Sequence, residues 1–146
     1  MNSLEKYTLI TGGTEGIGLE LAKLFALDKH NLIIVARDGE KLKDVKEKIE
    51  EEFNVKVEII SADLSVDNSC EKIYEFVDKK NLTVDNLINN AGVQFPQNNI
   101  NCISQEQLEL TFKINIFSMF YITQEALKYM KRGSTIVNTT SVTAYQ

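Results

Sequence analysis

Short apolar runs alternate along the chain with segments in which apolar residues recur every three or four positions. The run at 32–35 is apolar without interruption, which is typical of a parallel strand buried on both faces, and a mostly apolar run at 7–11 precedes it. Amphipathic helical patterns follow the two runs, at about 17–27 and 40–52. The chain therefore begins with two strand–helix units.

The same alternation continues through the rest of the chain. Further strands are predicted at 55–60, 85–92 and 134–140, with helices from about Asp67 and over about 104–130 between them. The long helix has clear boundary signals in the sequence. A Ser followed three positions later by Gln opens it as a capping box does, and a Lys-Arg-Gly sequence follows it.

The resulting order of elements predicts an α/β fold, a doubly wound parallel sheet (Rossmann-like) of about five strands in the order 3-2-1-4-5. We expect one domain over 1–146, incomplete in its C-terminal half. Ligands of such sheets bind at the C-terminal ends of the strands. Besides a glycine-rich turn after the first strand, Arg37, Asp63, Asn90 and Ser141 follow the other four strands.

The glycine-rich turn lies at 11–18, between the first strand and the first helix. Four of the seven glycines of the chain fall within these positions. Glycine permits positive φ and lets a phosphate approach the backbone, and the helix that follows directs its N–H groups and positive dipole end to the same place. A dinucleotide pyrophosphate is the best candidate ligand. Because the spacing Gly-x-x-x-Gly-x-Gly differs from G-x-G-x-x-G and a plain loop is the alternative, this prediction needs support from other residues.

Composition and charge narrow the classes of protein. The 146 residues are 43% hydrophobic and 25% charged, an ordinary globular composition. No apolar run approaches the roughly 20 residues of a membrane span, and the N-terminus lacks a signal-peptide pattern, so we expect no membrane partner and a cytoplasmic location. A net charge of −5 without a basic cluster argues against nucleic acid as a partner.

The cysteines and the single histidine give no metal pattern. Cys70 and Cys102 form no CxxC pair, and we expect both to be reduced. His30 lies in a polar connection where a solvated residue is the simpler interpretation. Neither a metal site nor a Ser-His-Asp triad is therefore expected.

Taken together, these motifs resemble the short-chain dehydrogenases/reductases, a family that uses NAD or NADP. The turn at 11–18 is similar to the family's cofactor turn, and Asn89-Asn90-Ala91-Gly92 is similar to its second signature. Asn115 and Ser141 lie at the relative spacings that the family shows. The resemblance covers essentially the whole chain.

The resemblance implies a set of cofactor contacts. They are Gly12, Gly16, Ile17 and Gly18 at the pyrophosphate, with Thr14 and Glu15 in the same turn, Asp63 and Leu64 at the adenine, and Asn90, Ala91 and Gly92 at the cofactor ribose. Two alternatives stay open. Gly18 could serve close packing of the helix on the sheet, and Asp63 could cap the turn after its strand.

The end of the second strand bears on the choice between NAD and NADP. A site for NAD usually places a carboxylate there for the ribose 2′-hydroxyl, whereas a 2′-phosphate needs a cation. Here Ala36 is followed by Arg37, so we predict NADP rather than NAD, although Glu15 and Asp38 stand nearby with opposing charge. The alternative is that Arg37 stacks on the adenine without discriminating.

The family transfers hydride between the nicotinamide and a carbonyl or alcohol, using Tyr, Lys, Ser and Asn. The resemblance assigns Ser141 to orient the substrate oxygen and Asn115 to hold a proton-relay water. The alternatives are that Ser141 is a turn residue and that Asn115 bonds to the backbone. The Tyr is expected about a dozen positions after Ser141, with Lys four positions later. Tyr145 is too close to Ser141 and no Lys follows it, so we expect this chain alone to lack the acid–base pair.

Two functions therefore remain at this point. The first is an NAD(P)-dependent oxidoreductase of small carbonyl or alcohol substrates, of which the 146-residue chain alone is predicted to be inactive. The second is a non-catalytic NADP-binding or interaction protein. The helix at 104–130 carries more apolar residues than one face can hold, and the strand around Ile136 is expected to form an open edge, so we predict a homo-oligomer through that helix.

Overall fold

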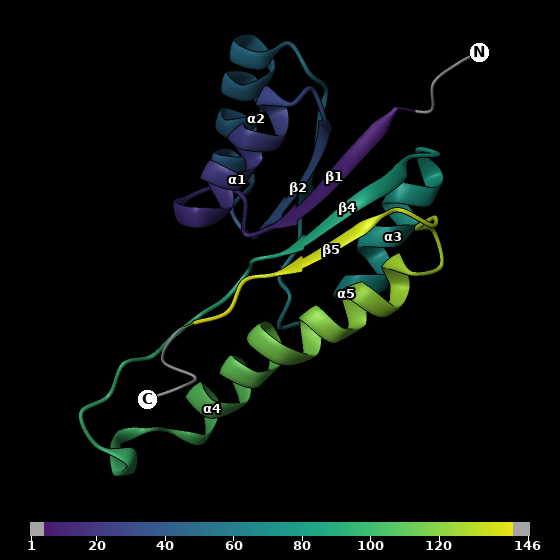
Figure 1. Cartoon of the computed structure of the whole chain (residues 1–146). Coiled ribbons are helices and arrows are strands. Elements are labelled where there is room, and N and C mark those ends of the chain that lie inside the picture. Colours follow the sequence, from purple (N-terminus) through teal and green to yellow (C-terminus); the bar gives the residue numbers. More distant parts are fainter. Residues whose placement is uncertain (1–4, 142–146) are drawn as a thin grey trace.

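The computed structural model describes residues 5–141, which form one sheet covered by helices (Figure 1). The strands are β1 (Lys6–Thr11), β2 (Asn31–Ala36), β3 (Val57–Ser61), β4 (Thr83–Asn89) and β5 (Thr135–Asn138). The helices are α1 (Gly16–Leu27), α2 (Gly39–Phe53), α3 (Ser69–Lys79), α4 (Gln105–Phe112) and α5 (Ser118–Ala126). Every strand and helix expected from the sequence is present.

The sheet has the order β3-β2-β1-β4-β5, and every neighbouring pair is parallel. The prediction of a doubly wound sheet with strand order 3-2-1-4-5 is therefore confirmed. In this order the chain reverses its direction of winding between β1 and β4, which places the C-terminal ends of these two strands on either side of the point where such folds bind ligands.

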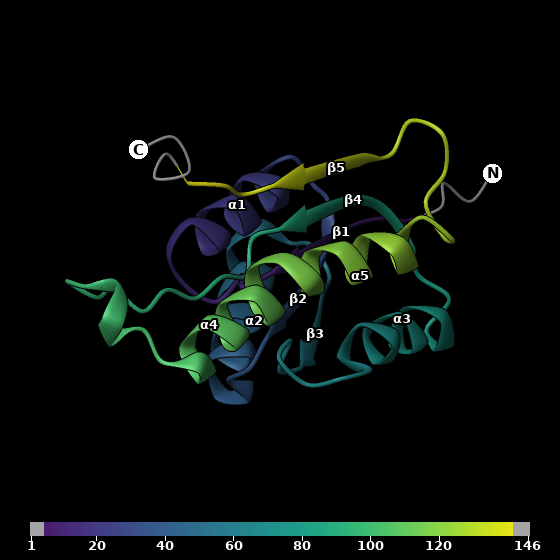
Figure 2. The same cartoon turned by 90° about the horizontal axis from the view of Figure 1, so that it is seen from below.

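Helices cover both faces of the sheet. α1 and α2 lie on one face, α3 and α5 lie on the other, and α4 continues the line of α5 beyond the ends of the strands (Figures 1 and 2). Successive residues of a strand point to opposite faces, so Ile10 packs in the layer of α1 and α2, whereas its neighbour Leu9 packs in the layer of α3 and α5. Continuous apolar strands are thus needed to fill both layers.

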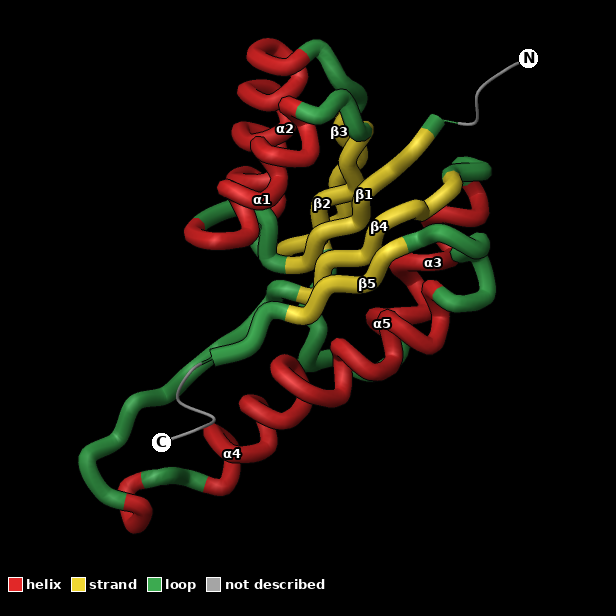
Figure 3. The backbone as a smooth tube through the Cα atoms, in the orientation of Figure 1, coloured by secondary structure: helices red, strands yellow, loops and turns green. Residues whose placement is uncertain are grey.

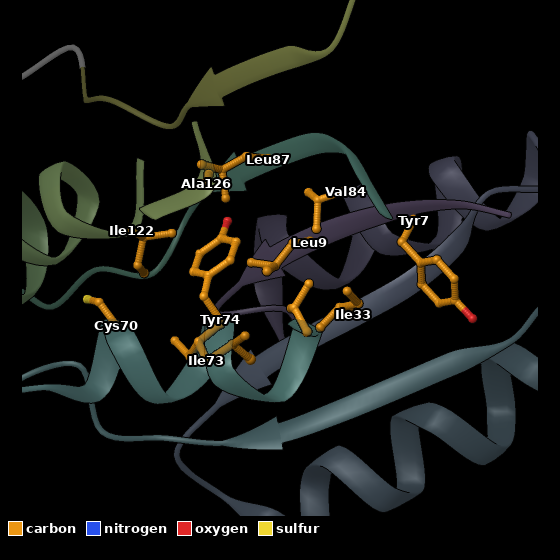
Figure 4. Close-up of a cluster of buried hydrophobic side chains, with 12 residues drawn as sticks. Tyr7, Leu9, Ile33, Cys70, Ile73, Tyr74, Val84, Leu87, Ile122 and Ala126 are labelled. Atoms are coloured by element: carbon orange, nitrogen blue, oxygen red, sulfur yellow. The ribbon is translucent and has the colours of Figure 1, made fainter. Parts of the chain in front are cut away.

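The layer beneath α3 and α5 is shown in Figure 4. Ile73 and Tyr74 of α3 and Ile122 of α5 gather around Leu9 and Leu87 of the sheet. All five side chains are at most 1% exposed. Burial of side chains of this size contributes about 1.5–3 kcal/mol each before entropy is counted, so this cluster fixes both helices against the sheet.

The long helix differs from its prediction in two ways. Its start is as expected, because Ser104 and Gln107 form a capping box. It ends at Ala126 rather than near Met130, so the predicted boundary is wrong by four residues. The N–H of Tyr129 donates at 2.9 Å to a carbonyl only three residues back, which closes the last turn. The ring of Tyr129 also stacks on that of Tyr74, with centroids 5.5 Å apart.

The second difference lies within this helix. Residues Lys113–Phe117 form a π-helical segment between α4 and α5, which the sequence did not indicate. Figure 3 shows the helix running beneath the sheet, joined to β4 by a long loop that extends beyond the strands. This loop contains a short 3₁₀ turn, Ile100–Cys102. No helix in the described part of the chain has the length and apolar character needed to cross a membrane.

Candidate functional site

The glycine-rich turn between β1 and α1 is held against the sheet at one end and open at the other. Gly12 and Gly16 have φ angles of 68° and 56°, which glycine adopts at little cost. The Gly12 N–H donates to the Val35 carbonyl at 2.8 Å and ties the turn to the end of β2. A Cβ on Gly16 would meet no atom within 4 Å. Backbone at this position is therefore accessible to a ligand.

Gly18 lies where α1 presses most closely on the turn. A Cβ at this position would lie 2.1 Å from the Gly12 carbonyl oxygen and 2.4 Å from Nδ2 of Asn90. The geometry supports the packing role that the sequence left as an alternative. Gly13 was not singled out from the sequence, yet its Cβ would lie 2.8 Å from Cγ2 of Ile34. Both glycines allow the turn to sit directly on its neighbours.

A hydrogen-bond network centred on Thr11 joins the turn to the end of β4. Thr11 Oγ1 accepts the backbone N–H groups of Asn90 and Ala91, both at 3.0 Å. In return, Asn90 Nδ2 donates to the carbonyls of Thr11 and Gly12, at 3.3 and 3.2 Å. Thr139 Oγ1, after β5, donates to Asn90 Oδ1 at 3.0 Å. Asn90 thereby connects the ends of β1, β4 and β5. The sequence motifs did not indicate that the side chains of Thr11 and Thr139 take part in this network.

A hollow of about 580 Å³ opens at these strand ends, within the usual size of a ligand pocket. Its walls include eight of the predicted cofactor residues, namely Gly12, Thr14, Glu15, Arg37, Leu64, Asn90, Ala91 and Gly92. Val93 and Ile114 complete the wall on the side of the long helix. Residues from four of the five strand ends are thus brought to one cavity.

The other predicted cofactor residues do not line the hollow. Gly16 and Gly18 have the roles described above, and the Ile17 side chain is 65% exposed at the start of α1. Asp63 Oδ1 accepts the backbone N–H of Ser65 at 2.9 Å and its hydroxyl at 2.7 Å. These hydrogen bonds from Ser65 lower the pKa of Asp63. The capping alternative describes the Asp63 contacts, and its contact with adenine stays a prediction.

Four charged side chains stand at the rim of the hollow where β1 and β2 end: Glu15, Arg37, Asp38 and Lys41. Asp38 caps α2, because its Oδ1 accepts the backbone N–H groups of Glu40 and Lys41 at 3.0 and 3.1 Å. Lys41 Nζ lies 2.7 Å from Oε2 of Glu15. The hydrogen bond from Lys41 lowers the pKa of Glu15. Both carboxylates whose charge opposes a bound phosphate therefore have a partner within the protein, Asp38 the backbone of α2 and Glu15 the side chain of Lys41.

Sequence reasoning did not assign Lys41 to the site. A signal was available, because Lys41 falls in the first turn of the helix that begins two residues after Arg37, on the predicted cofactor side of the sheet. What the sequence could not supply was its partner. Glu15 is 26 positions away and reaches Lys41 only when β1 and β2 pair.

Asn115 lies in the π-helical segment and holds the loop after β4. Its Oδ1 accepts the N–H of Val93, and its Nδ2 donates to the Val93 carbonyl, both at 2.8 Å. This is the backbone-bonded alternative considered from the sequence. The amide fixes the chain next to Gly92 in the wall of the hollow, so a structural role is observed and a catalytic one stays a prediction.

Ser141 follows β5 and is exposed at the last described position. It comes two residues after Thr139, whose contact with Asn90 brings this segment beside the end of β4. The chain thus carries Ser141 to the same edge of the sheet as the hollow. Tyr145, which was rejected as the acid–base group from its position in the sequence, lies outside the described residues.

Cysteine and histidine do not contribute a metal site within residues 5–141. No cluster of three or more His, Cys, Asp or Glu side chains suited to a metal ion occurs in that range. Cys70 and Cys102 are both free. Burial raises the pKa of the Cys70 thiol, which makes this thiol less reactive.

A family model described as short chain dehydrogenase matches residues 6–146. The chain belongs to the short-chain dehydrogenase family. General stress protein 39 of Bacillus subtilis (strain 168) is 40% identical over 141 residues, which are 96% of this chain. NADPH-dependent aldehyde reductase 1, chloroplastic, of Arabidopsis thaliana is 38% identical over 147 residues, or 97% of this chain. Family membership confirms the resemblance drawn from the two glycine motifs.

Solved structures of the short-chain dehydrogenase family share the fold. L-sorbose reductase from Gluconobacter frateurii, complexed with NADPH and L-sorbose, superposes with a TM-score of 0.91 at 26% identity over 98% of this chain. The chain covers 55% of that structure, and 49% and 51% of the two relatives above. It therefore spans about half the length of the relatives it matches. The family and these neighbours support binding of a nicotinamide cofactor.

Proposed function

We propose that this chain provides the cofactor-binding part of an NADP-dependent short-chain oxidoreductase acting on a small carbonyl or alcohol. The observation that carries the proposal is the hollow at the strand ends, where the glycine turn and Asn90–Gly92 are joined by the Thr11 network. The open backbone at Gly16 and the N-terminus of α1 suit the pyrophosphate. The nicotinamide, when bound, supplies or accepts the hydride. The protein residues bind and orient it.

The preference for NADP rests on the charge at the end of β2. Arg37 lines the hollow and is exposed, and a guanidinium binds phosphate with paired donors. The relative from Arabidopsis thaliana is named for NADPH, and the Gluconobacter frateurii structure holds NADPH. Both facts concern those proteins, and they favour the same cofactor here.

Replacing Arg37 with Ala is expected to weaken NADPH binding about tenfold or more, because a charge-assisted contact with the 2′-phosphate is lost. NADH binding should change less than twofold. Fluorescence titration of the chain with each cofactor measures both constants. Arg132→Ala is the matched control, since Arg132 lies in the turn between α5 and β5, remote from the hollow. A preference for NADH in the parent chain that persists in Arg37→Ala would refute NADP specificity.

We further propose that Ser141 orients the substrate oxygen and that Asn115 positions the wall beside it. The Tyr and Lys that complete the family's chemistry are not assigned to any residue of this chain. Residues 1–146 are therefore expected to bind NADPH yet to show no sustained loss of its absorbance at 340 nm with ketones or aldehydes. Sustained turnover by the chain alone would show that another residue donates the proton. Cofactor binding without turnover in any longer form would favour a non-catalytic binding protein.

The long helix is proposed as the surface through which copies of the chain associate. Exposed apolar side chains lie along it from Leu108 to Tyr121, with exposures of 47–62%. They include Leu108, Phe112, Ile116, Phe117, Phe120 and Tyr121. An exposed apolar surface of this extent is typical of an interface. Figure 2, the view from below, shows α4 and α5 in front of the sheet.

Sedimentation velocity at micromolar concentration is expected to show a species larger than the 16.5 kDa monomer. Phe120→Glu, which places a charge on a side chain that is 62% exposed, should shift the population toward monomer. Ile17→Glu on α1, with 65% exposure, is the matched control on the opposite face and should leave the distribution unchanged. A monodisperse monomer in the parent chain would refute association through this helix.

We also propose a cytoplasmic location. Both cysteines are free, and the exposed Cys102 suits a reducing compartment. Immunofluorescence or fractionation of cells producing the tagged protein tests this proposal. Recovery with a membrane or secreted fraction would contradict it.

A further inference from the structure

The ion pair between Glu15 and Lys41 lies across the rim of the hollow. It joins the glycine turn before α1 to the first turn of α2, and both residues line the cavity. Lys41 Nζ and Glu15 Oε2 are 2.7 Å apart, and the two side chains are 53% and 75% exposed. An ion pair this exposed contributes little to stability and exchanges partners readily.

Of the two cations at this rim, Arg37 and Lys41, only Lys41 is paired with a carboxylate among the described residues. Asp38 is occupied by the backbone of α2. Arg37 has no salt bridge among residues 5–141, so it is open to a ligand anion. Glu15 alone depends on a neighbouring side chain for its counter-ion. The rim therefore carries two cations: Arg37, which no carboxylate pairs with among residues 5–141, and Lys41, which is paired with Glu15.

We propose that Lys41 determines specificity for the 2′-phosphate by leaving Glu15 for that phosphate when NADP binds. This inference rests on the proposed NADP function. A phosphate monoester carries nearly two negative charges and three acceptor oxygens, so it competes well with one carboxylate for a flexible ammonium. NAD presents only a neutral hydroxyl at this position, which binds an ammonium more weakly than a carboxylate does, so Lys41 stays paired with Glu15. The Glu15–Lys41 ion pair therefore breaks when NADP binds and persists when NAD binds.

The exchange also gives Glu15 a defined effect. Once Lys41 leaves, the Glu15 carboxylate stands near the phosphate without its counter-ion, and like charges repel. Glu15 should therefore weaken NADP binding, while Lys41 strengthens it. A pair that served only as a structural brace between α1 and α2 would instead affect both cofactors equally, whichever partner is removed.

Titrations of the 146-residue chain with NADPH and NADH test the exchange. Lys41→Met should weaken NADPH binding about tenfold and leave NADH within twofold, whereas Glu15→Gln should strengthen NADPH binding about threefold. Lys43→Met is the matched control. Lys43 pairs with Glu40 at 2.8 Å on the same helix, is similarly exposed, and does not line the hollow. It should change neither constant.

A second measurement does not depend on affinity. In the free chain Lys41 lowers the pKa of the Glu15 carboxyl. NMR titration of that carboxyl should show its pKa rising when NADPH saturates the protein, because Lys41 has left and an anion has arrived. With NADH the pKa should stay low.

The outcomes separate this inference from the proposed function. If the parent chain prefers NADPH and Arg37→Ala removes the preference, but Lys41→Met leaves the NADPH-to-NADH ratio unchanged, the exchange is refuted and NADP binding stands. Equal weakening of both cofactors by Lys41→Met identifies a brace and also refutes the exchange. If the parent chain shows no preference for NADPH, the proposed NADP specificity fails and the exchange fails with it.

Discussion

Gly18→Ala is expected to destabilise the protein by about 3 kcal/mol or more, an unusually large effect for one added methyl group. The new Cβ would lie 2.1 Å from the Gly12 carbonyl oxygen and 2.4 Å from Asn90 Nδ2. Neither atom can move away cheaply, because Asn90 is bonded to the same turn and to Thr139. Relief of the clash requires α1 to shift away from the sheet. The hollow would then lose its shape, so NADPH binding should be abolished.

Urea denaturation of the chain and two glycine controls measures this effect. Gly39→Ala, at the start of α2 in open space and without a positive φ, should change stability by less than about 0.5 kcal/mol. Gly16→Ala, in open space but at a φ of 56°, should cost about 1 kcal/mol through backbone strain alone. The expected order of damage is thus Gly18, then Gly16, then Gly39. Equal midpoints for Gly18→Ala and Gly39→Ala would show that the close packing is absent.

Thr11→Val should cost about 2–4 kcal/mol of stability, because it removes one acceptor from two backbone N–H groups. Thr11 is 2% exposed, and valine has nearly the same shape, so little of the effect can come from packing. The orphaned N–H groups belong to Asn90 and Ala91, whose backbone lines the hollow. NADPH binding should therefore weaken together with stability.

Thr11→Ser is the matched control, since it keeps the hydroxyl and loses only a methyl group, at a cost of about 1 kcal/mol. Thermal unfolding and NADPH titration of both variants give the comparison. A valine variant as stable as the serine variant would mean that the hydroxyl does not hold the end of β4. In that case another contact must join β1 to β4 at the site.

The sequence predicted the strands and helices closely because each is encoded locally. A buried parallel strand needs an apolar run, and a helix on a sheet needs an apolar stripe, so both patterns can be read without knowing the partners. The capping box at Ser104 was equally local, and it was correct. The helix end near Met130 was wrong because the closing turn is shaped by the stacking of Tyr129 on Tyr74, which belongs to another helix.

The candidate site shows the same division. Gly12 could be found because a glycine-rich turn after a strand is a local signal for close approach of a ligand. Asn90, Ala91 and Gly92 were found through the family resemblance, which also rests on a short local motif. Thr11 was placed at the start of the glycine-rich turn, but the sequence did not indicate what its side chain contacts. Its importance lies in contacts with residues 79 and 80 positions away, which no local pattern records.

The sequence by itself determined the order of elements, the parallel sheet and the edge at which a ligand would bind, since periodicity and glycine placement act over a few residues. Only the tertiary structure decided which side chains meet there. In the folded chain Asp63 is hydrogen-bonded to Ser65, Asn115 is hydrogen-bonded to the backbone of Val93, and Glu15 forms an ion pair with Lys41. Except for the Asp63 turn, these contacts join residues that are brought together by strand pairing and helix packing. Their energies depend on distances of a few ångströms that the linear pattern does not contain.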